Sequence, residues 1–343
     1  MTTGIVRDAR YLDHKTGDFH VECPMRLEVI YGMLDEEPGA WTEIPARPAS
    51  DEEIGRIHTA RHIQRIKDTE GKELVALDAD TATSPGSAQA AFLAAGGFIE
   101  AVGAVMRGDV DNAFALVRPP GHHAEADRAL GFCLFNNAAV GACSLIEDHG
   151  MKRILIVDWD LHHGNGTQNS FYSTDKVLYF STHQFPLYPG SGHWRETGQG
   201  PGEGYTLNVP LRAGKGDADY LYVFRTILKP AALAYKPEFV IVSAGFDIYG
   251  GDPLGGMEVT AEGFGALAAE VMDIARECCG GRLALVLEGG YNGKGLKEGV
   301  RAILNQLSGR APRPRIAADP SPELLSELEP MIKFFRSFRP IPS

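Results

Sequence analysis

The fold of this 343-residue chain is decided by one stretch, Asp158-Trp-Asp160-Leu-His162-His163-Gly164-Asn165-Gly166-Thr167. It follows an apolar, β-branched run, Arg153-Ile-Leu-Ile-Val157, which is typical of a buried central strand. Charged side chains and two glycines then end the strand pattern abruptly. In an open α/β sheet such a point is the carboxyl end of a strand, where ligand sites gather. Asp160 and His162 would face the same side, and this pair suits a divalent metal as well as a simple hydrogen-bonded pair.

Strands and helices alternate along the rest of the chain. Apolar runs predict strands at 4–6, 113–117, 153–158, 177–181, 205–209, 239–243 and 283–287. Caps and helical periodicity predict helices beginning at Pro24 and after Ser50, and others at about 62–67, 87–106, 136–149, 218–235 and 261–279. Residues 9–23 and 78–86 are polar and irregular, so we expect surface loops there. This order predicts a single-domain α/β fold with a mostly parallel sheet flanked by helices on both faces.

The end of the chain differs from the rest in composition. Arg310-Ala-Pro-Arg-Pro-Arg315 is a Pro-rich basic linker, and residues 322–338 have the pattern of an amphipathic helix. We therefore expect one domain over 1–309. Over 310–343 we expect a linker and a C-terminal helix that packs on the body.

Composition limits the classes of function. The formal net charge of −12 argues against direct nucleic-acid binding and suits a cationic substrate. Cys23, Cys133, Cys143, Cys278 and Cys279 are odd in number and lack CxxC spacing, so we expect reduced thiols, mostly in the core. We find no apolar signal core at the N-terminus and expect no membrane-spanning run. The resulting expectation is a cytoplasmic protein, with its oligomeric state left open.

Four predicted strand ends carry unusual polar groups. Besides the opening stretch, they are Arg118-Pro-Pro-Gly-His122-His123, Ser243-Ala-Gly-Phe-Asp247 and Glu288-Gly-Gly-Tyr291. Each of them alone also fits a helix cap or a packing feature. At the corresponding ends of adjacent strands, however, all four would converge on one cleft.

Convergence would assign a role to each group. Asp160, His162 and Asp247 would give a metal three protein ligands and leave positions open for water and substrate, as in a catalytic site. Such an ion lowers the pKa of its bound water and polarises a carbonyl oxygen. His122 and His123 are then the candidates for general base and general acid.

Three further residues complete this chemistry. Asp158 and Asn165 are the local supports for the two imidazoles, and they would tune them differently, because a carboxylate raises the basicity of a ring and an amide does not. The phenol of Tyr291, beside two flexible glycines, could donate a hydrogen bond to the developing oxyanion. Together these groups predict an amide hydrolase.

The motifs resemble those of the zinc-dependent histone deacetylase family, within the arginase–deacetylase superfamily, from about residue 4 to residue 307. Further matching segments are Asp78-x-Asp80-Thr81-x-x-Ser84-Pro, Gly131-Phe-Cys-x-Phe-Asn-Asn137 and Gly251-Asp-Pro-Leu-Gly255. Asn165, where class I members have Asp, makes the chain similar to class II. The resemblance implies an eight-stranded, mostly parallel sheet flanked by helices. It also implies hydrolysis of acetyl or longer acyl groups from the ε-amine of lysine in proteins or peptides.

The resemblance also implies roles for individual residues. Zinc would be held by Asp160, His162 and Asp247, ligands that would also accept iron(II). The catalytic residues would be His122, His123 and Tyr291, with Asp158 supporting His122 and Asn165 facing His123. The substrate-binding residues would be Gly131, Phe132, Tyr188 and Leu254. Arg26 matches an arginine near the base of the site.

Family members also bind structural potassium, and the resemblance implies two such sites here. One would use main-chain oxygens of Asp158, Asp160 and His162, together with Ser181 and Thr182. The other would use Phe171, Thr174, Val177 and Tyr205.

Other functions stay open. An acetylpolyamine amidohydrolase is favoured a little by length and acidic charge. Against it stand the lack of a long insertion before His122 and the presence of Leu254 where polyamine-selective relatives place an acidic residue. A catalytically silent acyl-lysine reader would lack Tyr291 or a metal ligand, and a manganese ureohydrolase would need more carboxylates. His14 and His20 could reach the site, but we expect a solvated loop that shapes the tunnel mouth.

Overall fold

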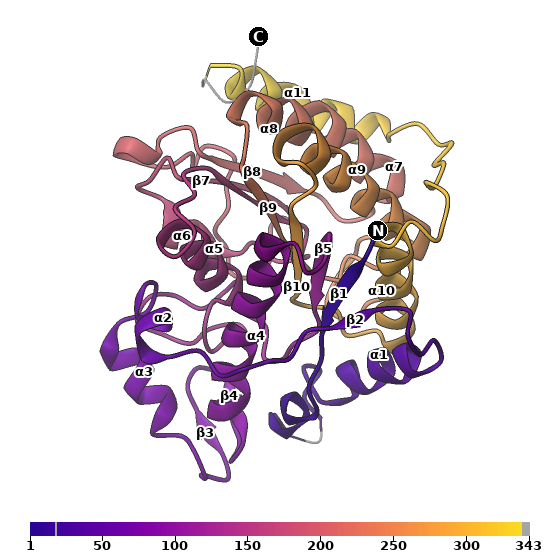
Figure 1. Ribbon diagram of the computed structural model, residues 1–343. Helices are drawn as coiled ribbons and strands as arrows, with labels where there is room; N and C mark the ends of the chain where they lie inside the picture. Colours follow the sequence, from indigo (N-terminus) through magenta and orange to yellow (C-terminus); the bar gives the residue numbers. More distant parts are fainter. Residues whose placement is uncertain (18, 338–343) are drawn as a thin grey trace.

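The computed structural model describes residues 1–17 and 19–337. Its main sheet has eight strands in the order β2-β1-β5-β10-β9-β6-β7-β8, all parallel (Figure 1). The strands are β1 Thr3–Val6, β2 Thr42–Glu43, β5 Asn112–Ala115, β6 Ile154–Asp158, β7 Val177–Gln184, β8 Thr206–Leu211, β9 Phe239–Ala244 and β10 Leu283–Leu287. A separate antiparallel ribbon pairs β3 Val75–Ala76 with β4 Ala82–Thr83. The predicted sheet is therefore confirmed.

Helices cover both faces of the sheet, as Figure 1 shows. One face carries α4 Ser87–Arg107, α5 Asn137–Glu147 and α6 Asn165–Phe171, with α2 Asp51–Gly55 and α3 Ala60–Lys67 beyond them. The other carries α1 Met25–Asp35, α7 Asp217–Val223, α8 Lys229–Tyr235, α9 Ala261–Cys279, α10 Gly293–Leu307 and α11 Pro322–Phe335. Short helical turns are η1 Ala9–Asp13, η2 Gly200–Gly202 and a π segment, η3 Phe224–Leu228, between α7 and α8. The predicted helix 218–235 thus contains an irregular turn, and α10 was not predicted.

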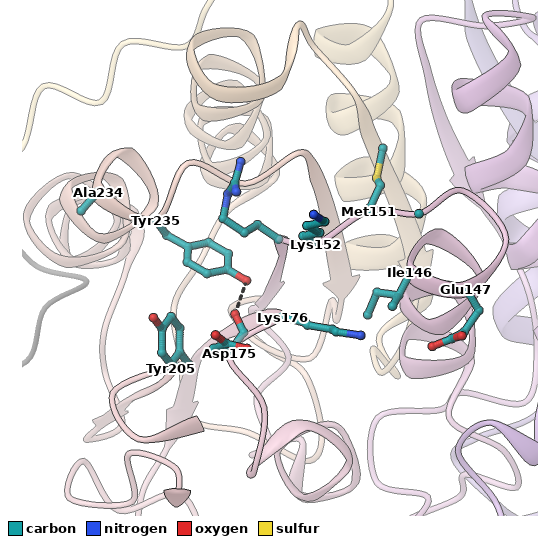
Figure 2. Close-up of a pocket in the computed structure, with 11 residues that line it drawn as sticks. Ile146, Glu147, Met151, Lys152, Asp175, Lys176, Tyr205, Ala234 and Tyr235 are labelled. Carbon is teal, nitrogen blue, oxygen red and sulfur yellow. Dashed lines mark hydrogen bonds between the residues drawn. The ribbon is translucent and has the colours of Figure 1, made fainter. Parts of the chain in front are cut away.

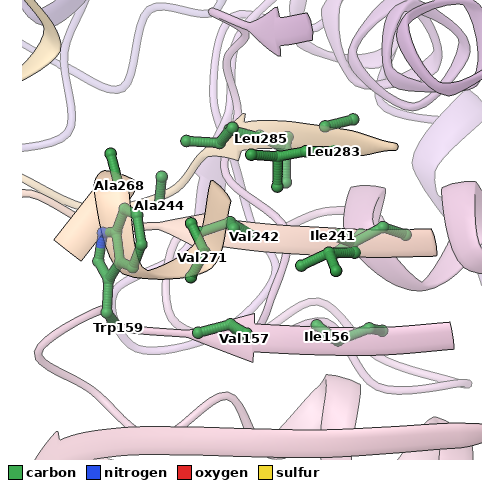
Figure 3. Close-up of a cluster of buried hydrophobic side chains, with 14 of the residues drawn as sticks. Ile156, Val157, Trp159, Ile241, Val242, Ala244, Ala268, Val271, Leu283 and Leu285 are labelled. Carbon is green, nitrogen blue, oxygen red and sulfur yellow. The ribbon is translucent and has the colours of Figure 1, made fainter. Parts of the chain in front are cut away.

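The centre of the sheet is apolar on both faces. Every residue of β6, β9 and β10 is buried, which explains why these strands have continuous apolar runs and no alternation. Figure 3 shows Val157 and Val242 side by side, with the indole of Trp159 beside Val271 of α9. The strands whose ends carry the polar motifs are therefore anchored by the core.

Helix α4 corrects one expectation from the sequence. It is long and apolar enough to cross a membrane, with a mean hydropathy of 1.5, although we expected no such run. In the structure, 78% of that apolar window is buried within the protein, and α4 packs on β5 and α5. A helix that is apolar on most sides and enclosed in this way is typical of a protein core.

Helix α11 lies against β8, and the part of the predicted helix at 338 falls outside the described residues. Leu324, Leu328 and Phe335 are buried. On the same helix the Phe334 ring meets Trp194 edge to face, with centroids 5.0 Å apart. The tail therefore contacts the loop that follows β7.

The five cysteines are all free thiols, as expected, but only Cys133 and Cys279 are buried. Cys23, Cys143 and Cys278 are half-buried, so the prediction that the thiols lie mostly in the core is wrong for these three. Cys143 of α5 and Cys278 of α9 nevertheless pack against the core from its edge.

Candidate active site

Four neighbouring strands, β5, β10, β9 and β6, end around one narrow cavity of about 220 Å³. Its wall is formed by Asp80, Pro120, His122, His123, Gly131, Phe132, His162, Tyr188, Leu254, Gly289 and Tyr291. The segments that predicted polar strand ends therefore meet at one place. They meet there because the carboxyl ends of parallel strands share one edge of the sheet.

Asp160, His162 and Asp247 form a buried cluster at this edge. One ligand atom from each lies within 4.8 Å of the other two. Nδ1 of His162 is 3.2 Å from Oδ1 of Asp160 and also 3.2 Å from Oδ2 of Asp247. Asp160 and His162 lie just beyond the end of β6, yet they still converge as the strand pattern suggested.

The donor set of this cluster fits a divalent cation. Oδ2 of Asp247 is buried and has no hydrogen-bond partner among the described residues. Burial, and then the charge of Asp160, raise the pKa of Asp247 to about 7. A cation among the three ligand atoms would satisfy that oxygen and stabilise both carboxylates in their charged form.

Backbone amides orient the two carboxylates. Gly289 N donates to Oδ2 of Asp160 at 2.8 Å, and Leu161 N donates to Oδ1 of Asp247 at 2.9 Å. A Cβ at position 289 would clash with Oδ2 of Asp247 and lie 2.6 Å from Oδ2 of Asp160. Only glycine therefore lets the chain approach both carboxylates at this point.

The two predicted catalytic histidines stand side by side, with ring centroids 4.0 Å apart. Nδ1 of His122 lies 3.1 Å from Oδ2 of Asp158, and Nδ1 of His123 lies 2.8 Å from Oδ1 of Asn165. The structure thus places a carboxylate behind one ring and an amide behind the other, as the sequence suggested.

Opposite pKa shifts follow from these surroundings. Burial alone would lower the pKa of His122, but the charges of Asp160 and Asp158 outweigh it and raise the pKa to about 10. Burial, and then the neighbouring rings of His122 and His162, hold the pKa of His123 well below its usual value. The pair therefore contains one ring that favours the charged form and one that favours the neutral form.

Tyr291 lies on the other side of the cavity. Its main-chain N donates to Oδ2 of Asp252 at 2.7 Å, and the Arg26 guanidinium lies 5.0 Å from the centroid of its ring. Burial raises the pKa of Tyr291 well above its ordinary value of 10.0, so its hydroxyl keeps the proton and can donate it in a hydrogen bond.

Two aromatic rings line the cavity where it opens. The Phe132 backbone is held in the left-handed region at φ 68°, which is rare for a non-glycine residue and is typical of functional sites. Tyr188, 37% exposed, has its ring centroid 5.2 Å from that of His123. The ring of His20 meets Phe132 edge-on at 4.8 Å.

The expectation of a solvated loop at 9–23 is confirmed only in part, because Lys15 and Phe19 are exposed but other side chains of the segment turn inward. Asp18 lies outside the described residues. Tyr11, His14 and Glu22 are buried. The Glu22 carboxylate forms ion pairs with Arg118 and, at 3.0 Å, with Arg26. Oppositely charged partners from distant segments explain how so polar a loop can be buried.

A family model, the histone deacetylase domain, matches residues 20–307. The chain belongs to the histone deacetylase family. It is 42% identical to a probable deacetylase of Archaeoglobus fulgidus, over 86% of this chain and 83% of that protein. It is 38% identical to histone deacetylase HDA1 of Candida albicans, over 99% of this chain. The crystal structure of the HDA15 HD domain superposes with a TM-score of 0.93 at 39% identity, covering 99% of this chain and 95% of that one.

Several of these relatives are longer than the chain. The chain spans about half the length of several curated histone deacetylases, 45% in the Candida protein. The family match begins at residue 20, whereas we expected it from about residue 4. What the chain carries is the histone deacetylase domain, which belongs to the arginase–deacetylase superfamily.

The supporting roles of two residues of this domain, Glu288 and Tyr179, escaped the sequence analysis. The Glu288 carboxylate accepts hydrogen bonds from Gly121 N at 2.7 Å and His122 N at 3.1 Å, so it fixes the loop that carries the histidine pair. Tyr179 donates its hydroxyl to Oδ2 of Asp158 at 3.0 Å. Glu288 stood in a quoted motif, but no sequence signal indicated which segment its side chain contacts.

The residues expected at the two potassium sites lie at different positions along β7, one set beside its carboxyl-terminal half and the other at its amino end. Asp158 pairs in register with Ser181 of β7, and Oγ1 of the adjacent Thr182 is buried with no hydrogen-bond partner among the described residues. At the opposite end of β7, Thr174 N donates to Phe171 O at 3.2 Å. Val177 begins the strand, and Tyr205 O accepts from Tyr179 N at 2.9 Å.

A larger cavity, about 620 Å³, lies at the amino ends of β6, β7 and β8 (Figure 2). Among its lining side chains are Lys152, Lys176, Asp175 and Tyr235, and the Tyr235 hydroxyl donates to Asp175 O at 3.0 Å. The two lysines and the aspartate are exposed. None of the predicted catalytic residues lies there.

Proposed function

We propose that the protein is a zinc-dependent amidohydrolase that removes acetyl or longer acyl groups from the ε-amine of lysine in proteins or peptides. The observation that supports this most is the arrangement around the narrow cavity. Three buried metal-ligand candidates, two adjacent imidazoles and a protonated phenol surround about 220 Å³. Family membership supports lysine deacetylation broadly.

Asp160, His162 and Asp247 would hold the zinc ion. When bound, zinc would supply a polarised water and draw electron density from the substrate carbonyl. The same ligand set would accept iron(II).

The protein's own groups would carry out the remaining steps. The neutral ring of His123 accepts a proton from the attacking water and gives this proton to the departing lysine amine as the C–N bond breaks. The ring of His122, which faces the Asp158 carboxylate at 3.1 Å, would stabilise the negative charge that develops nearby. Tyr291 donates a hydrogen bond to the carbonyl oxygen, whose charge grows along the reaction.

The cavity wall supports a lysine-like substrate. Phe132 and Tyr188 would enclose the methylene chain and exclude water, while Gly131 O would accept the substrate amide. Leu254 at the cavity favours an acyl-lysine peptide over acetylpolyamine, because an apolar residue gives no partner to a second ammonium group. Acetylpolyamine hydrolysis remains the alternative, and we also propose structural potassium at the two sites beside β7.

The test compares kcat/KM for an acetyl-lysine peptide and for acetylspermidine, using zinc-loaded protein. We expect the peptide to be the better substrate. A large excess for acetylspermidine would establish the alternative. Binding of the peptide with no turnover of either substrate would instead favour a silent reader of acyl-lysine.

A further inference from the structure

Glu125 follows the histidine pair on the loop between β5 and α5, and its side chain points back toward the pair's support. Its Oε1 accepts from Nδ2 of Asn165 at 2.6 Å and from Nδ2 of Asn169 at 2.9 Å. Glu125 is half-buried and does not line the catalytic cavity. Its carboxylate therefore contacts Asn165, the residue that contacts His123, and not the substrate space.

These contacts fix which way the Asn165 amide points. Its Nδ2 faces two acceptors, the Glu125 carboxylate and, at 3.3 Å, the main-chain oxygen of His123. A flipped amide would place Oδ1 against both of these oxygens, which is repulsive. Oδ1 must therefore face Nδ1 of His123, 2.8 Å away, and that nitrogen must be the donor.

We propose that Glu125 is a positioning residue that, through Asn165, holds the proton of His123 on Nδ1 and leaves Nε2 as the nitrogen that exchanges protons. The proposal rests on the proposed function, because it concerns the ring that would accept the proton from water. The lone pair of Nε2 is then directed to the cavity side of the ring, where the reaction takes place.

The two histidines would thus be oriented by different means. His122 faces the carboxylate of Asp158 directly, at 3.1 Å. His123 faces a neutral amide, and the carboxylate that orients this amide is one group further away. The indirect arrangement keeps a negative charge from direct contact with His123, so the ring stays neutral but has a defined tautomer.

The first experiment measures steady-state kinetics and thermal stability of Glu125→Ala and Glu125→Gln. We expect Glu125→Ala to lower kcat about tenfold with KM unchanged, at the low end of the effect of losing an outer partner of a site. Glu125→Gln should lower kcat less, because the glutamine amide oxygen can still accept a hydrogen bond from Asn165. The matched control is Asp127→Asn, which removes an exposed charge on the same loop that pairs with Arg61 at 3.5 Å, and it should keep wild-type kcat. Equal kcat for Glu125→Ala and the control, or a loss of kcat matched by the loss of folded protein, overturns the proposal.

The second experiment reads the tautomer directly. Long-range proton–nitrogen NMR spectra of zinc-loaded full chain with labelled histidine report which ring nitrogen carries the proton. We expect an Nδ1–H ring for His123 in the wild-type protein and a mixture of tautomers in Glu125→Ala. An Nε2–H ring in the wild type overturns the proposal. This readout does not require turnover, so it separates failure of this proposal from failure of the proposed function.

The third experiment tests the coupling of the two side chains. Asn165→Asp would place a second carboxylate 2.6 Å from that of Glu125, so it should lower kcat. Adding Glu125→Gln removes the repulsion and should restore part of the lost kcat. If the two substitutions have independent, multiplicative effects, Glu125 does not act through Asn165 and the proposal fails.

Discussion

The cavity of Figure 2 and the narrow cavity of the candidate active site lie at opposite edges of one sheet, and they differ in how their charges are solvated. The larger one, about 620 Å³, is lined by lysine and aspartate side chains that water reaches. The smaller one, about 220 Å³, is lined by His122 and His123, each 3% exposed. Volume therefore does not indicate the site. Buried ionisable groups with specific partners do, because burying them without function would be unfavourable.

The difference follows from the direction of the strands. At the amino ends, β6 is preceded by Lys152 and Arg153 and β7 by Asp175 and Lys176, and all four residues are exposed. At the carboxyl ends, four segments turn inward, and backbone amides such as Gly289 N hold their carboxylates. Substitutions at the carboxyl ends of the strands should therefore change activity strongly, and equivalent substitutions at the amino ends should not.

The largest effect is expected from loss of the metal ligands. A chelator should bring activity to background, and added zinc should restore it. Asp247→Asn should not be restored by zinc at concentrations that saturate the wild type, because the ligand set then has one carboxylate fewer. Metal content by mass spectrometry, together with activity, provides the measurement. Full activity of metal-free protein would contradict the metal site.

Tyr291→Phe should lower kcat about 10²- to 10³-fold while leaving the metal bound, since it removes one donor to the developing oxyanion and no metal ligand. Single-turnover kinetics and metal content check this. Phe132→Leu is a suitable control within the same wall, because it keeps an apolar side chain and should affect KM more than kcat. Near-normal turnover in Tyr291→Phe would remove the oxyanion role.

Much of this contrast could be predicted from the sequence, because the strands and the polar groups at their ends are local signals. Residues 153–158 were predicted as a strand from their apolar run, and β6 covers Ile154–Asp158. Helix α10 was not predicted, because Gly293, Gly295 and Gly299 lower its helix propensity. Two of these glycines admit neighbouring rings: a Cβ at Gly295 would lie 2.5 Å from Tyr249, and one at Gly299 2.7 Å from Phe246.

The partners of buried charges could not be predicted, because they depend on tertiary contacts. Glu22 and Arg118 are 96 positions apart, and nothing near either residue indicates that they meet. The same holds for Glu125 and Asn165, 40 positions apart. Local polarity alone predicted solvent for residues 9–23, and the long-range ion pairs reversed that outcome for Glu22.

Contacts near the candidate active site should also make the stability of the fold sensitive to acid. His58 Nδ1 donates to Glu125 O at 2.9 Å, and its Nε2 accepts from Asn136 N at 2.9 Å, so the ring must be neutral in the folded state. Burial, and then His62, lower its pKa to about 3. Because the pKa of His58 is lower in the folded protein than in the unfolded chain, the unfolded chain binds the proton more readily. The stability that the neutral ring contributes above pH 6.5 is therefore lost as the pH falls from there toward 3.

The measurement is the unfolding free energy of wild type and His58→Gln at several pH values below 6.5, by urea denaturation. Glutamine can donate and accept as the neutral ring does, but it does not titrate. The wild-type free energy should fall more steeply, by about 1.4 kcal/mol per pH unit, the value for one proton. Parallel slopes for the two proteins would show that His58 is not the titrating group.

The smallest effect is expected at the cavity of Figure 2. Lys176→Ala removes a charge that lines this larger cavity, yet its side chain is exposed and lies at the far end of β7 from the catalytic residues. Because Lys176 does not line the narrow cavity, kcat/KM should stay within about twofold of the wild type, and the free energy of unfolding should change by about 0.5 kcal/mol or less. Glu125→Ala, measured in parallel, removes one half-buried charge near the candidate active site, and its kcat/KM should be clearly lower than that of the wild type. A tenfold loss in Lys176→Ala would mean that the two edges of the sheet are energetically coupled, and the contrast drawn between the cavities would then fail.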